Sequence, residues 1–285
     1  MAVPPLRALR AAGHDIALCV TRPDRRRGRG TAVTPSPVKQ AAAELGIPVS
    51  HAMDDIVAAG VELAVVVAYG RIIPATLLEL VPMVNLHFSL LPRWRGAAPV
   101  ERALLAGDPE TGVCLMKVEE GLDTGPVYAR RVVPLGEEIS LDALRAALVE
   151  VASALVVESL AAGVAGLPVP EPQQGTPTIA PKLMPAELQL HWEHEGVQLH
   201  RVVRLGRAWT TFRGRRLGIL RATPFDPPTP RAPVEPPGTL MGTAVATGDG
   251  LLGLEEVQPE SRAAMSADDW VRGVRPLVGE RLGSD

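Results

Sequence analysis

The sequence predicts an α/β protein in which a mostly parallel sheet domain is followed by a small antiparallel β-barrel. Three observations support this prediction. Strand-like apolar runs alternate with helical segments over residues 1–165. A segment rich in proline, glycine and glutamine follows at 166–185, and this composition is typical of a linker. Beyond it, short strand-like runs alternate with glycine and proline turns, a pattern that favours a barrel over residues 186–285.

The elements of the first domain are predicted from the periodicity of apolar residues. Residues 62–70 form an almost continuous apolar run, which is typical of a strand covered on both faces. Residues 83–89 alternate instead, so that one strand face is apolar and the other carries Asn85, His87 and Ser89. The predicted elements, in order, are a strand at 14–21, a helix at 37–46, a strand at 62–70, a helix at 74–80, a strand at 83–89, a helix at 97–106, strands at 112–118 and 126–133, and a helix at 141–163.

The second domain is predicted from shorter runs. A chain of 285 residues is long for one compact domain and comfortable for two. After the linker, a helix at about 196–205 leads into a series of strands. The strands are predicted at 209–214, 215–225, 238–250 and 251–258. We therefore expect one domain at 1–165 and a second at 186–285.

The composition excludes several classes of protein. Hydrophobic residues make up 46% and charged residues 21%, so the chain can bury sizeable cores and is not disordered. Aromatic residues are only 3%, which argues against an aromatic base-stacking surface. No secretory apolar region and no run long enough to span a bilayer is present, so we expect a cytoplasmic protein without a membrane partner. Cys19 and Cys114 lie among apolar residues and are expected to be buried free thiols.

Positive charge is concentrated in two parts of a chain whose net charge is −3. Residues 22–39 hold five arginines and a lysine against the single acid Asp24. From Gly196 to Arg221 there are seven arginines and no acid. Ordinary solvated loops are one explanation for such stretches. Because two separate acid-free or nearly acid-free stretches occur in an acidic protein, a polyanionic partner is favoured.

Candidate chemistry lies at the end of the strand at 83–89. Ligands bind beyond the carboxyl ends of strands in parallel sheets. Asn85 and His87 share one face there, and an amide with an imidazole could stabilise an oxyanion that develops on a carbonyl. Asp123, in the glycine-flanked segment EEGLDTG, is the best candidate for a carboxylate that orients His87. On spacing alone, these are also ordinary core, surface and turn residues.

Two further classes of site are not supported by the sequence. No serine or cysteine has a nucleophile-elbow context, so direct attack by a substrate amine is more natural than a covalent intermediate. The six histidines and two cysteines lack ligand spacing, so no metal is predicted. The residues by themselves therefore indicate carbonyl chemistry, without identifying the substrate.

Several segments together resemble methionyl-tRNA formyltransferases over essentially the whole chain. SLLPRWRGAAP at 89–99 and GLDTG at 121–125 carry the resemblance most clearly. The arginine-rich loop within 21–39 and the segment WTTFRGRRLGILRA at 209–222 also match. SLLP alone would indicate only the wider group of enzymes that use formyltetrahydrofolate, whereas the other segments narrow the resemblance to the tRNA enzyme.

The resemblance implies a fold and a reaction. The first domain would be a Rossmann-like formyltransferase domain at 1–165, and the C-terminal barrel would be OB-like and bind tRNA. The formyl group of 10-formyltetrahydrofolate would pass to the α-amine of methionyl initiator tRNA, for translation initiation. Asn85 and His87 would stabilise the tetrahedral oxyanion, while Asp123 would hold His87 and help to move the proton of the amine.

The resemblance also implies where the substrates bind. The folate-binding segment would be Ser89, Leu90, Leu91 and Pro92, and we expect it to line the largest cleft, close to Asn85 and Asp123. We expect a monomer. The arginines assigned to tRNA are Arg29, Arg201, Arg204, Arg213, Arg215 and Arg216.

The chain departs from the family at its start. Relatives begin with an apolar strand and a Gly-Thr-Pro turn, whereas this chain opens at MAVPPLRALR. The missing strand would lie inside the sheet, so we expect two neighbouring strands to lose hydrogen-bond partners. This departure puts stability and activity in question, but not the family.

Three other functions share part of the pattern. A formyltransferase for a sugar amine or small ribonucleotide amine would keep Asn85, His87 and Asp123, but should lack the arginine-rich loop and the basic barrel. A hydrolase of formyltetrahydrofolate would use water in place of the amine and usually carries a different accessory domain. An inactive RNA-binding protein is the third alternative, which the intact catalytic positions disfavour.

Overall fold

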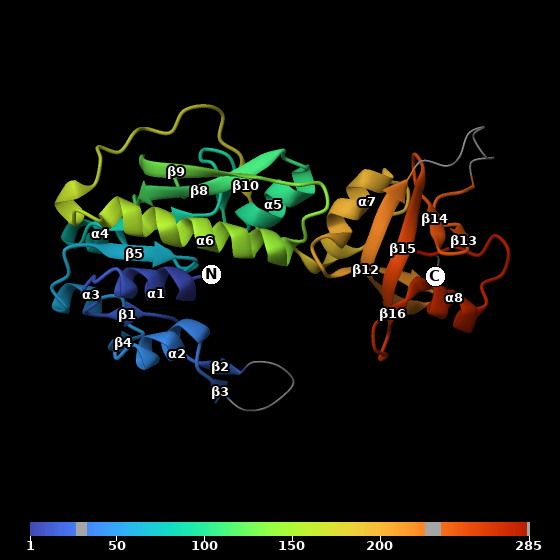
Figure 1. The fold of residues 1–285 in the computed structure, drawn as a ribbon, viewed down its shortest axis with the longest axis horizontal. Coiled ribbons are helices and arrows are strands. Elements are labelled where there is room, and N and C mark those ends of the chain that lie inside the picture. Colours follow the sequence, from blue (N-terminus) through green and yellow to red (C-terminus); the bar gives the residue numbers. More distant parts are fainter. Residues whose placement is uncertain (27–32, 226–234, 284–285) are drawn as a thin grey trace. The chain divides into compact units, whose positions relative to one another are not determined.

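The computed structural model describes residues 1–26, 33–225 and 235–283, and the chain forms two compact units (Figure 1). The first unit contains most of the α/β part, and the second contains the antiparallel part. Their residues are Met1–Val100, Pro109–Pro134 and Arg145–Pro181 for the first unit, and Glu101–Asp108, Leu135–Leu144 and Lys182–Asp285 for the second.

The main sheet of the first unit has four strands in the order β5-β6-β8-β9. β5 and β6 are parallel, whereas β8 is antiparallel to both β6 and β9. The short connection 118–126 explains the last pairing, because a parallel pair would need a crossover of a dozen residues or more. The expected parallel character therefore holds for β5 and β6, and the sheet as a whole is mixed. The strands are β5 (Ala64–Val67), β6 (Met83–His87), β8 (Glu110–Lys117) and β9 (Val127–Pro134).

The centre of this sheet is the core of the first unit. Val84 and Leu86 on β6, and Val113 and Leu115 on β8, are completely or almost completely buried. The interior residues of β8 are buried without alternation, so both faces of this strand are covered. In the register of the pair, His87 lies opposite Cys114. The end of β6 that carries His87 is therefore anchored in packed core.

One helix of the first unit, α2, begins at a serine that caps its first turn. At the start of α2, the Ser36 hydroxyl accepts a hydrogen bond from the Lys39 N–H at 3.2 Å, and Pro37 occupies the first turn. The predicted helices at 37–46, 74–80, 97–106 and 141–163 are confirmed to within a few residues, whereas α1 and α3 were not predicted. The helices up to residue 166 are α1 (Val3–Ala11), α2 (Pro37–Glu44), α3 (Asp55–Ala58), α4 (Ala75–Leu80), α5 (Pro99–Ala106) and α6 (Leu141–Leu160), followed by the 3₁₀ turn η1 (Val164–Gly166). Most of α5 and the first residues of α6 belong to the second unit.

Three short strand pairs complete the first unit. The strand predicted at 14–21 is much shorter in the structure, because only Cys19 and Val20 find a partner strand. The pairs are β1 (Cys19–Val20) with β4 (Val49–Ser50), which is parallel, β2 (Arg25–Arg26) with β3 (Val33–Thr34), which is antiparallel, and β7 (Arg95–Gly96) with β10 (Ile179–Ala180), which is parallel.

A cavity of about 900 Å³ separates β1 from β5. Among the described residues, β1 pairs only with β4 and β5 pairs only with β6, so each has one edge without a partner strand. Both strands line the cavity, and α1 contributes Leu6 and Leu9 to its wall. The hydroxyl of Tyr69, which also lines it, is buried and has no hydrogen-bond partner among the described residues. The structure thus places a cavity beside two strand edges, while the expected loss of hydrogen-bond partners stays a prediction.

The proline-rich segment predicted as a linker at 166–185 is bonded to the first unit over much of its length. Glu171 and Val127 exchange backbone hydrogen bonds of 2.8 and 2.9 Å. Ile179 and Ala180 form β10 and pair with β7. The composition of this segment does not show these bonds, because an extended strap and a free linker favour the same residue types. The segment at 166–185, called the strap from here on, therefore belongs to the surroundings of the site that is described below.

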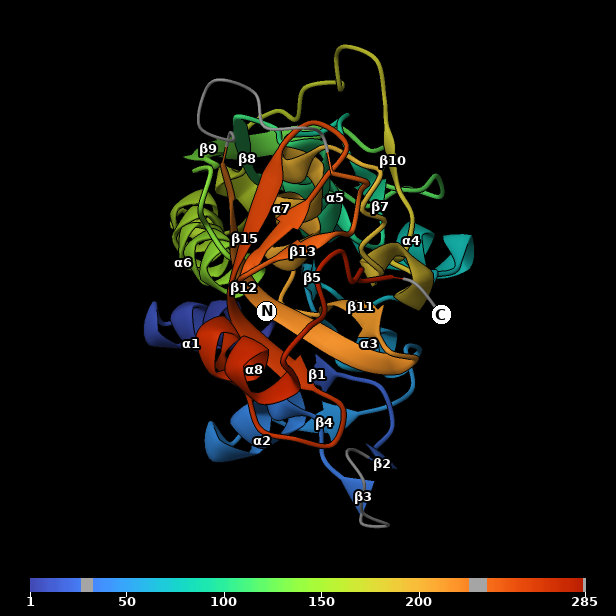
Figure 2. The same cartoon turned by 90° about the vertical axis from the view of Figure 1, so that its right-hand side faces the viewer.

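The second unit is built on a six-stranded antiparallel sheet (Figure 2). Its order is β11-β12-β15-β14-β13, with β16 added to β15. The antiparallel fold of this region is as predicted, and closure into a barrel stays a prediction. α8 was not predicted. The elements are the 3₁₀ turn η2 (Pro185–Leu188), α7 (Gly196–Val203), β11 (Ala208–Phe212), β12 (Arg215–Phe225), β13 (Leu240–Met241), β14 (Ala244–Ala246), β15 (Leu251–Pro259), β16 (Met265–Ser266) and α8 (Ala267–Val274).

One apolar core holds the second unit together. It joins alternating residues of the sheet, such as Leu217 and Ile219, to the helices that contact β12 and β15. The rings of Phe212 and Trp270 meet edge to face with centroids 5.1 Å apart. Across both units, no helix among the described residues combines the length and the apolar character that spanning a bilayer requires.

Candidate active site

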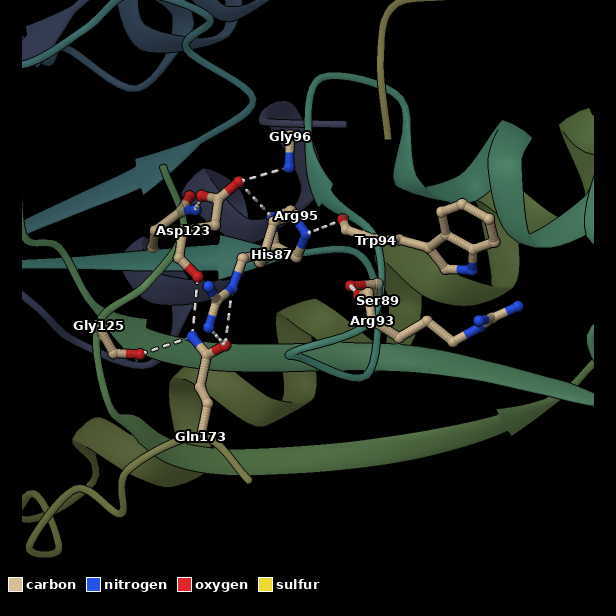
Figure 3. Close-up of polar contacts among 10 residues, drawn as sticks. His87, Ser89, Arg93, Trp94, Arg95, Gly96, Asp123, Gly125 and Gln173 are labelled. Carbon is tan, nitrogen blue, oxygen red and sulfur yellow. Dashed lines mark hydrogen bonds and ion pairs between the residues drawn. The ribbon is translucent and has the colours of Figure 1, made fainter. Parts of the chain in front are cut away.

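Three residues that the sequence predicts as catalytic lie together in the first unit, and Figure 3 shows two of them, His87 and Asp123. Asn85 and His87 are alternate residues of β6, so both project from the same face of the strand. Asp123 lies in the turn between β8 and β9. The Asn85 Nδ2 is 3.5 Å from the Asp123 Oδ1, and the His87 Nδ1 is 3.6 Å from the Asp123 Oδ2. The fold therefore brings an amide, an imidazole and a carboxylate into one cluster.

Both ring nitrogens of His87 face protein atoms. The side chain is 5% exposed, and its Nε2 lies 2.9 Å from the Trp94 carbonyl oxygen. Because a carbonyl only accepts, Nε2 carries the proton and donates it. In the neutral ring, Nδ1 then has a lone pair directed at the Asp123 carboxylate. The pair is thus arranged to hold one additional proton between Nδ1 and the carboxylate.

Burial lowers the pKa of His87, because charging the ring there would remove the imidazolium from water. The negative charge of Asp123 and the hydrogen bond to the Trp94 carbonyl raise this pKa and so oppose the effect. The lowering by burial is the larger of these influences. His87 therefore favours the neutral form in the free protein, in which it can accept a proton at Nδ1.

The carboxylate of Asp123 is held from several sides. Its Oδ2 accepts the Gly96 N–H at 2.8 Å, and its side chain is only 17% exposed. Its backbone has a φ of 50°, in the left-handed region that costs free energy for residues other than glycine. Gly125 is required in the same turn, since an added Cβ would lie 2.0 Å from the Lys117 carbonyl oxygen. The turn is therefore a strained conformation that its neighbours maintain.

The predicted folate-binding segment begins inside the core. Ser89 is fully buried and donates to the Arg93 carbonyl at 2.5 Å. Leu91 is buried against Cys114, Met116 and Val127. The side chains of Leu90 and Pro92 are half-buried. The cavity of about 900 Å³ beside β1 and β5 does not include this segment, and the expectation that the segment lines the largest cleft stays a prediction.

Sequence reasoning missed one residue of this cluster, Gln173. Its side-chain Nε2 donates to the Asp123 and Gly125 carbonyl oxygens, in both cases at 2.8 Å (Figure 3). Its Oε1 accepts from Arg95, at 2.7 Å from Nη2 and 3.1 Å from Nε. The only sequence signal was a glutamine in a proline-rich segment, and this signal does not indicate a contact with Asp123.

The arginines predicted to bind tRNA differ in their surroundings. Arg204 is 8% exposed and donates to the Ile139 and Gly136 carbonyls, each at 2.9 Å, so its guanidinium is held inside the second unit. Arg201 is half-buried and donates to the Ala106 carbonyl at 3.3 Å. Arg29 lies outside the described residues.

The remaining three predicted arginines, Arg213, Arg215 and Arg216, are exposed near the turn between β11 and β12. Arg213 forms a two-point ion pair with Glu280, with distances of 2.6 and 2.8 Å. The guanidinium of Arg216 stacks over the Trp209 ring at 4.5 Å. This group therefore offers exposed positive charge on the second unit.

The described residues contain no group of three or more histidine, cysteine, aspartate or glutamate side chains that could hold a metal ion. His87 and Asp123 are the nearest approach to such a group in the cluster, and the third member is the amide of Asn85. The arrangement is thus suited to hydrogen bonding and proton transfer at a carbonyl.

Comparison with known proteins places both parts of the chain. Residues 3–160 match the family model described as Formyl transferase, and residues 182–275 match the one described as Formyl transferase, C-terminal domain. The methionyl-tRNA formyltransferase of Heliobacterium modesticaldum is 41% identical over 305 aligned positions, covering 99% of this chain and 96% of that protein. The protein of the same name from Methylococcus capsulatus is 41% identical over 303 positions, with the same two coverages.

Solved structures share the fold at lower identity. An N-formyltransferase from Helicobacter canadensis, in complex with folinic acid and dTDP-3-aminofucose, has a TM-score of 0.67 and 15% identity, covering 89% of this chain and 95% of that chain. HypX from Aquifex aeolicus, in complex with tetrahydrofolic acid, has a TM-score of 0.58 and 19% identity, covering 84% of this chain and 44% of that chain. On the family models and the curated relatives, this chain belongs to the formyltransferase family and, within it, to the methionyl-tRNA formyltransferases.

Proposed function

We propose that this chain transfers the formyl group of 10-formyltetrahydrofolate to the α-amine of methionine on initiator tRNA. The observation that carries the proposal is the contact between His87 and Asp123 beside Asn85, at the end of β6. The names of the curated relatives support the tRNA substrate. The folate ligands of two proteins of the same fold support the donor.

The proposed reaction is a direct attack of the amine nitrogen on the formyl carbon. A carbon–nitrogen bond forms to the methionyl amine, and the bond from the formyl carbon to N10 of the folate breaks. The amine loses one proton and N10 gains one, so no water or further reactant is consumed. Negative charge collects on the formyl oxygen in the tetrahedral intermediate, which is where hydrogen-bond donors lower the barrier most.

Asn85 and His87 are the proposed donors to that oxygen. The Asn85 amide is neutral and can donate without a change of protonation. The proton on the His87 Nε2 is held by the Trp94 carbonyl in the free protein. The proposal therefore requires that substrate binding replaces this carbonyl by the formyl oxygen. Asp123 then stabilises the ring and, with Nδ1, accepts the proton that leaves the amine.

The folate is proposed to bind along Ser89, Leu90, Leu91 and Pro92. Because Ser89 and Leu91 are buried, their contribution would be the shape and the backbone groups of the loop. Leu90 and Pro92 are the side chains of this segment with exposed area. Their contacts would be apolar, as is usual for the greater part of a cofactor site.

The tRNA is proposed to bind through phosphate contacts of arginines. Arg213, Arg215 and Arg216 are exposed and can approach a phosphate backbone. Arg201 and Arg29 belong to the same proposal. Arg204 is assigned a structural part in it, because its guanidinium already binds two backbone carbonyls.

The test is an assay with defined substrates. The protein is incubated with 10-formyltetrahydrofolate and methionyl initiator tRNA, and the product is analysed for formylmethionyl-tRNA and released tetrahydrofolate in equal amounts. An amino-sugar nucleotide replaces the tRNA in a parallel reaction. Formylation of the sugar but not of the tRNA would overturn the substrate assignment. Release of formate without formylated product would instead indicate a hydrolase.

A further inference from the structure

One side chain of the strap at 171–177 turns inward. The other residues of this stretch are exposed, whereas Gln173 is half-buried. Its amide nitrogen donates both of its protons to carbonyl oxygens, and its oxygen accepts from Arg95. The hydrogen-bonding groups of this carboxamide are thus all in use.

Gln173 connects the turn that carries Asp123 to the loop that binds the Asp123 carboxylate. On one side, Gln173 binds the backbone of the turn that presents Asp123, through the carbonyls of Asp123 and Gly125. On the other side, it binds Arg95, whose neighbour Gly96 donates its N–H to the Asp123 Oδ2 at 2.8 Å. Gln173 therefore links the Asp123 turn to the loop that contains Arg95 and Gly96, next to the Asp123 carboxylate (Figure 3).

Thr178, just after this stretch, positions the Trp94 carbonyl, which is the other partner of His87. The Thr178 hydroxyl accepts the Trp94 N–H at 2.8 Å, and the Thr178 carbonyl accepts the Arg95 N–H at 2.8 Å. Trp94 has a φ of 63°, and its carbonyl binds the His87 Nε2. Thr178 therefore holds the backbone whose carbonyl binds His87, and Gln173 holds the turn whose carboxylate faces it. The Trp94 carbonyl and the Asp123 carboxylate therefore both depend on contacts with one segment, which is distant from them in sequence.

We propose that Gln173 is a positioning residue for formyl transfer, which holds the Asp123 carboxylate at the distance from His87 that proton transfer requires. This inference rests on the function proposed above. Asp123 has a left-handed φ and is not held by a helix or a strand, so the turn needs outside support. A displacement of about 1 Å in a catalytic group can cost about 100-fold in rate.

The test compares two glutamines that are adjacent in the chain. Gln173→Glu keeps the length of the side chain and the acceptor for Arg95, but it removes both N–H donors and places charge against two carbonyl oxygens. We expect kcat to fall by about 10- to 100-fold, while the KM for methionyl-tRNA stays within about twofold. Gln174→Glu is the matched control, because Gln174 is exposed, and it should leave both constants unchanged.

Two further measurements separate positioning from a loss of stability. The kcat–pH profile of Gln173→Ala, which adds no charge, should show the His87 pKa moved downward, since the charge of Asp123 is one of the influences that raise it. Amide exchange at Gly96 should become at least about tenfold faster, because the carboxylate that accepts this N–H is no longer held. The exchange measurement needs no activity, and Gln173→Ala provides a second variant without the new charge.

The outcomes distinguish this inference from the proposed function. If both Gln173 variants keep kcat within twofold and leave Gly96 exchange unchanged, Gln173 is not a positioning residue. A lower melting temperature with an unmoved pH profile and unmoved Gly96 exchange would also overturn the inference. Asp123→Asn is measured in the same assay. If it is fully active, the assignment of the site fails as a whole, and the inference fails with it.

Discussion

The Nδ1 atom of His87 lies 3.6 Å from the Oδ2 atom of Asp123, and the opposite nitrogen of the same ring donates to the Trp94 carbonyl at 2.9 Å. These two contacts give the two nitrogens of the ring different roles, because Nδ1 can accept a proton and Nε2 can donate one. A proton taken up at Nδ1 would be shared with a carboxylate. In the proposed mechanism, the Nε2 proton passes from the Trp94 carbonyl to a substrate oxygen. The buried ring thus has one accepting and one donating side.

His87→Ala should lower kcat by about two orders of magnitude or more, because it removes an oxyanion donor and the proton acceptor together. The affinity for tRNA, measured by filter binding, should change little, since His87 is 5% exposed. His191→Ala is a suitable control, because His191 is exposed in the second unit. Near-normal turnover of the His87 variant would remove this residue from the proposed mechanism.

The free energy of unfolding should decrease on acidification through a second buried histidine. His200 is 5% exposed, and burial lowers its pKa, against the opposing effect of Glu138 at 3.3 Å. The unfolded state, with a pKa near 6.5, then binds the proton more readily than the folded state. Stability is unaffected well above pH 6.5 and falls as the pH drops from there towards the lower pKa of the folded protein.

His200→Gln should reduce this dependence, because the variant has no proton to take up. Each unit by which the pKa is lowered corresponds to about 1.4 kcal/mol at low pH. Melting curves between pH 8 and pH 5 give the measurement, and His191→Gln, at an exposed position, is the control. If the two variants show the same dependence on pH, His200 does not contribute to acid sensitivity.

Simultaneous replacement of Arg213, Arg215 and Arg216 by alanine should weaken tRNA binding and flatten its dependence on salt. Each phosphate contact that is lost reduces the slope of log K against log salt by about one, so a change of about two to three is expected. Arg272→Ala is the control, since this arginine is exposed on α8 and forms an ion pair with Asp269. A slope unchanged by the triple replacement would contradict the proposed tRNA surface.

An additional strand in the cavity between β1 and β5 should stabilise the first unit. Both strands have an edge without a partner strand among the described residues, and a cavity of about 900 Å³ is large on the scale of protein interiors. Net stabilities of domains are only about 5–15 kcal/mol, so filling this space should raise the melting temperature clearly. Turnover should rise as well, because β5 pairs directly with β6, which carries Asn85 and His87.

The experiment joins an apolar, β-branched strand and a Gly-Thr-Pro turn to the N-terminal side of Met1. Melting temperature and turnover are compared with those of the 285-residue chain. The control is an extension of equal length with prolines at alternate positions, which cannot pair along both edges. Equal stability and activity with all three chains would show that the strand edges are satisfied in another way.

The sequence by itself determined the class of fold, most elements and the catalytic candidates. Dense apolar runs and helical spacing depend directly on burial. The strands predicted at 62–70 and 83–89 and the helix predicted at 37–46 are therefore present in the structure. The alternation of apolar and polar residues along β6 is enough to put Asn85 and His87 on one face of the strand. The glycines around Asp123 indicated a turn, and its φ of 50° agrees with that.

Only the tertiary structure decided how these candidates are held. Contacts between Gln173 and Asp123 join residues 50 positions apart, and local periodicity carries no information on such pairs. The same applies to Arg204, whose sequence neighbourhood suggested a surface cation but whose guanidinium is bound to carbonyls of a distant loop. Strand pairing also depends on which strand edges meet in space. The shortness of β1 and the cavity beside β5 therefore result from tertiary packing, which the local sequence does not reveal.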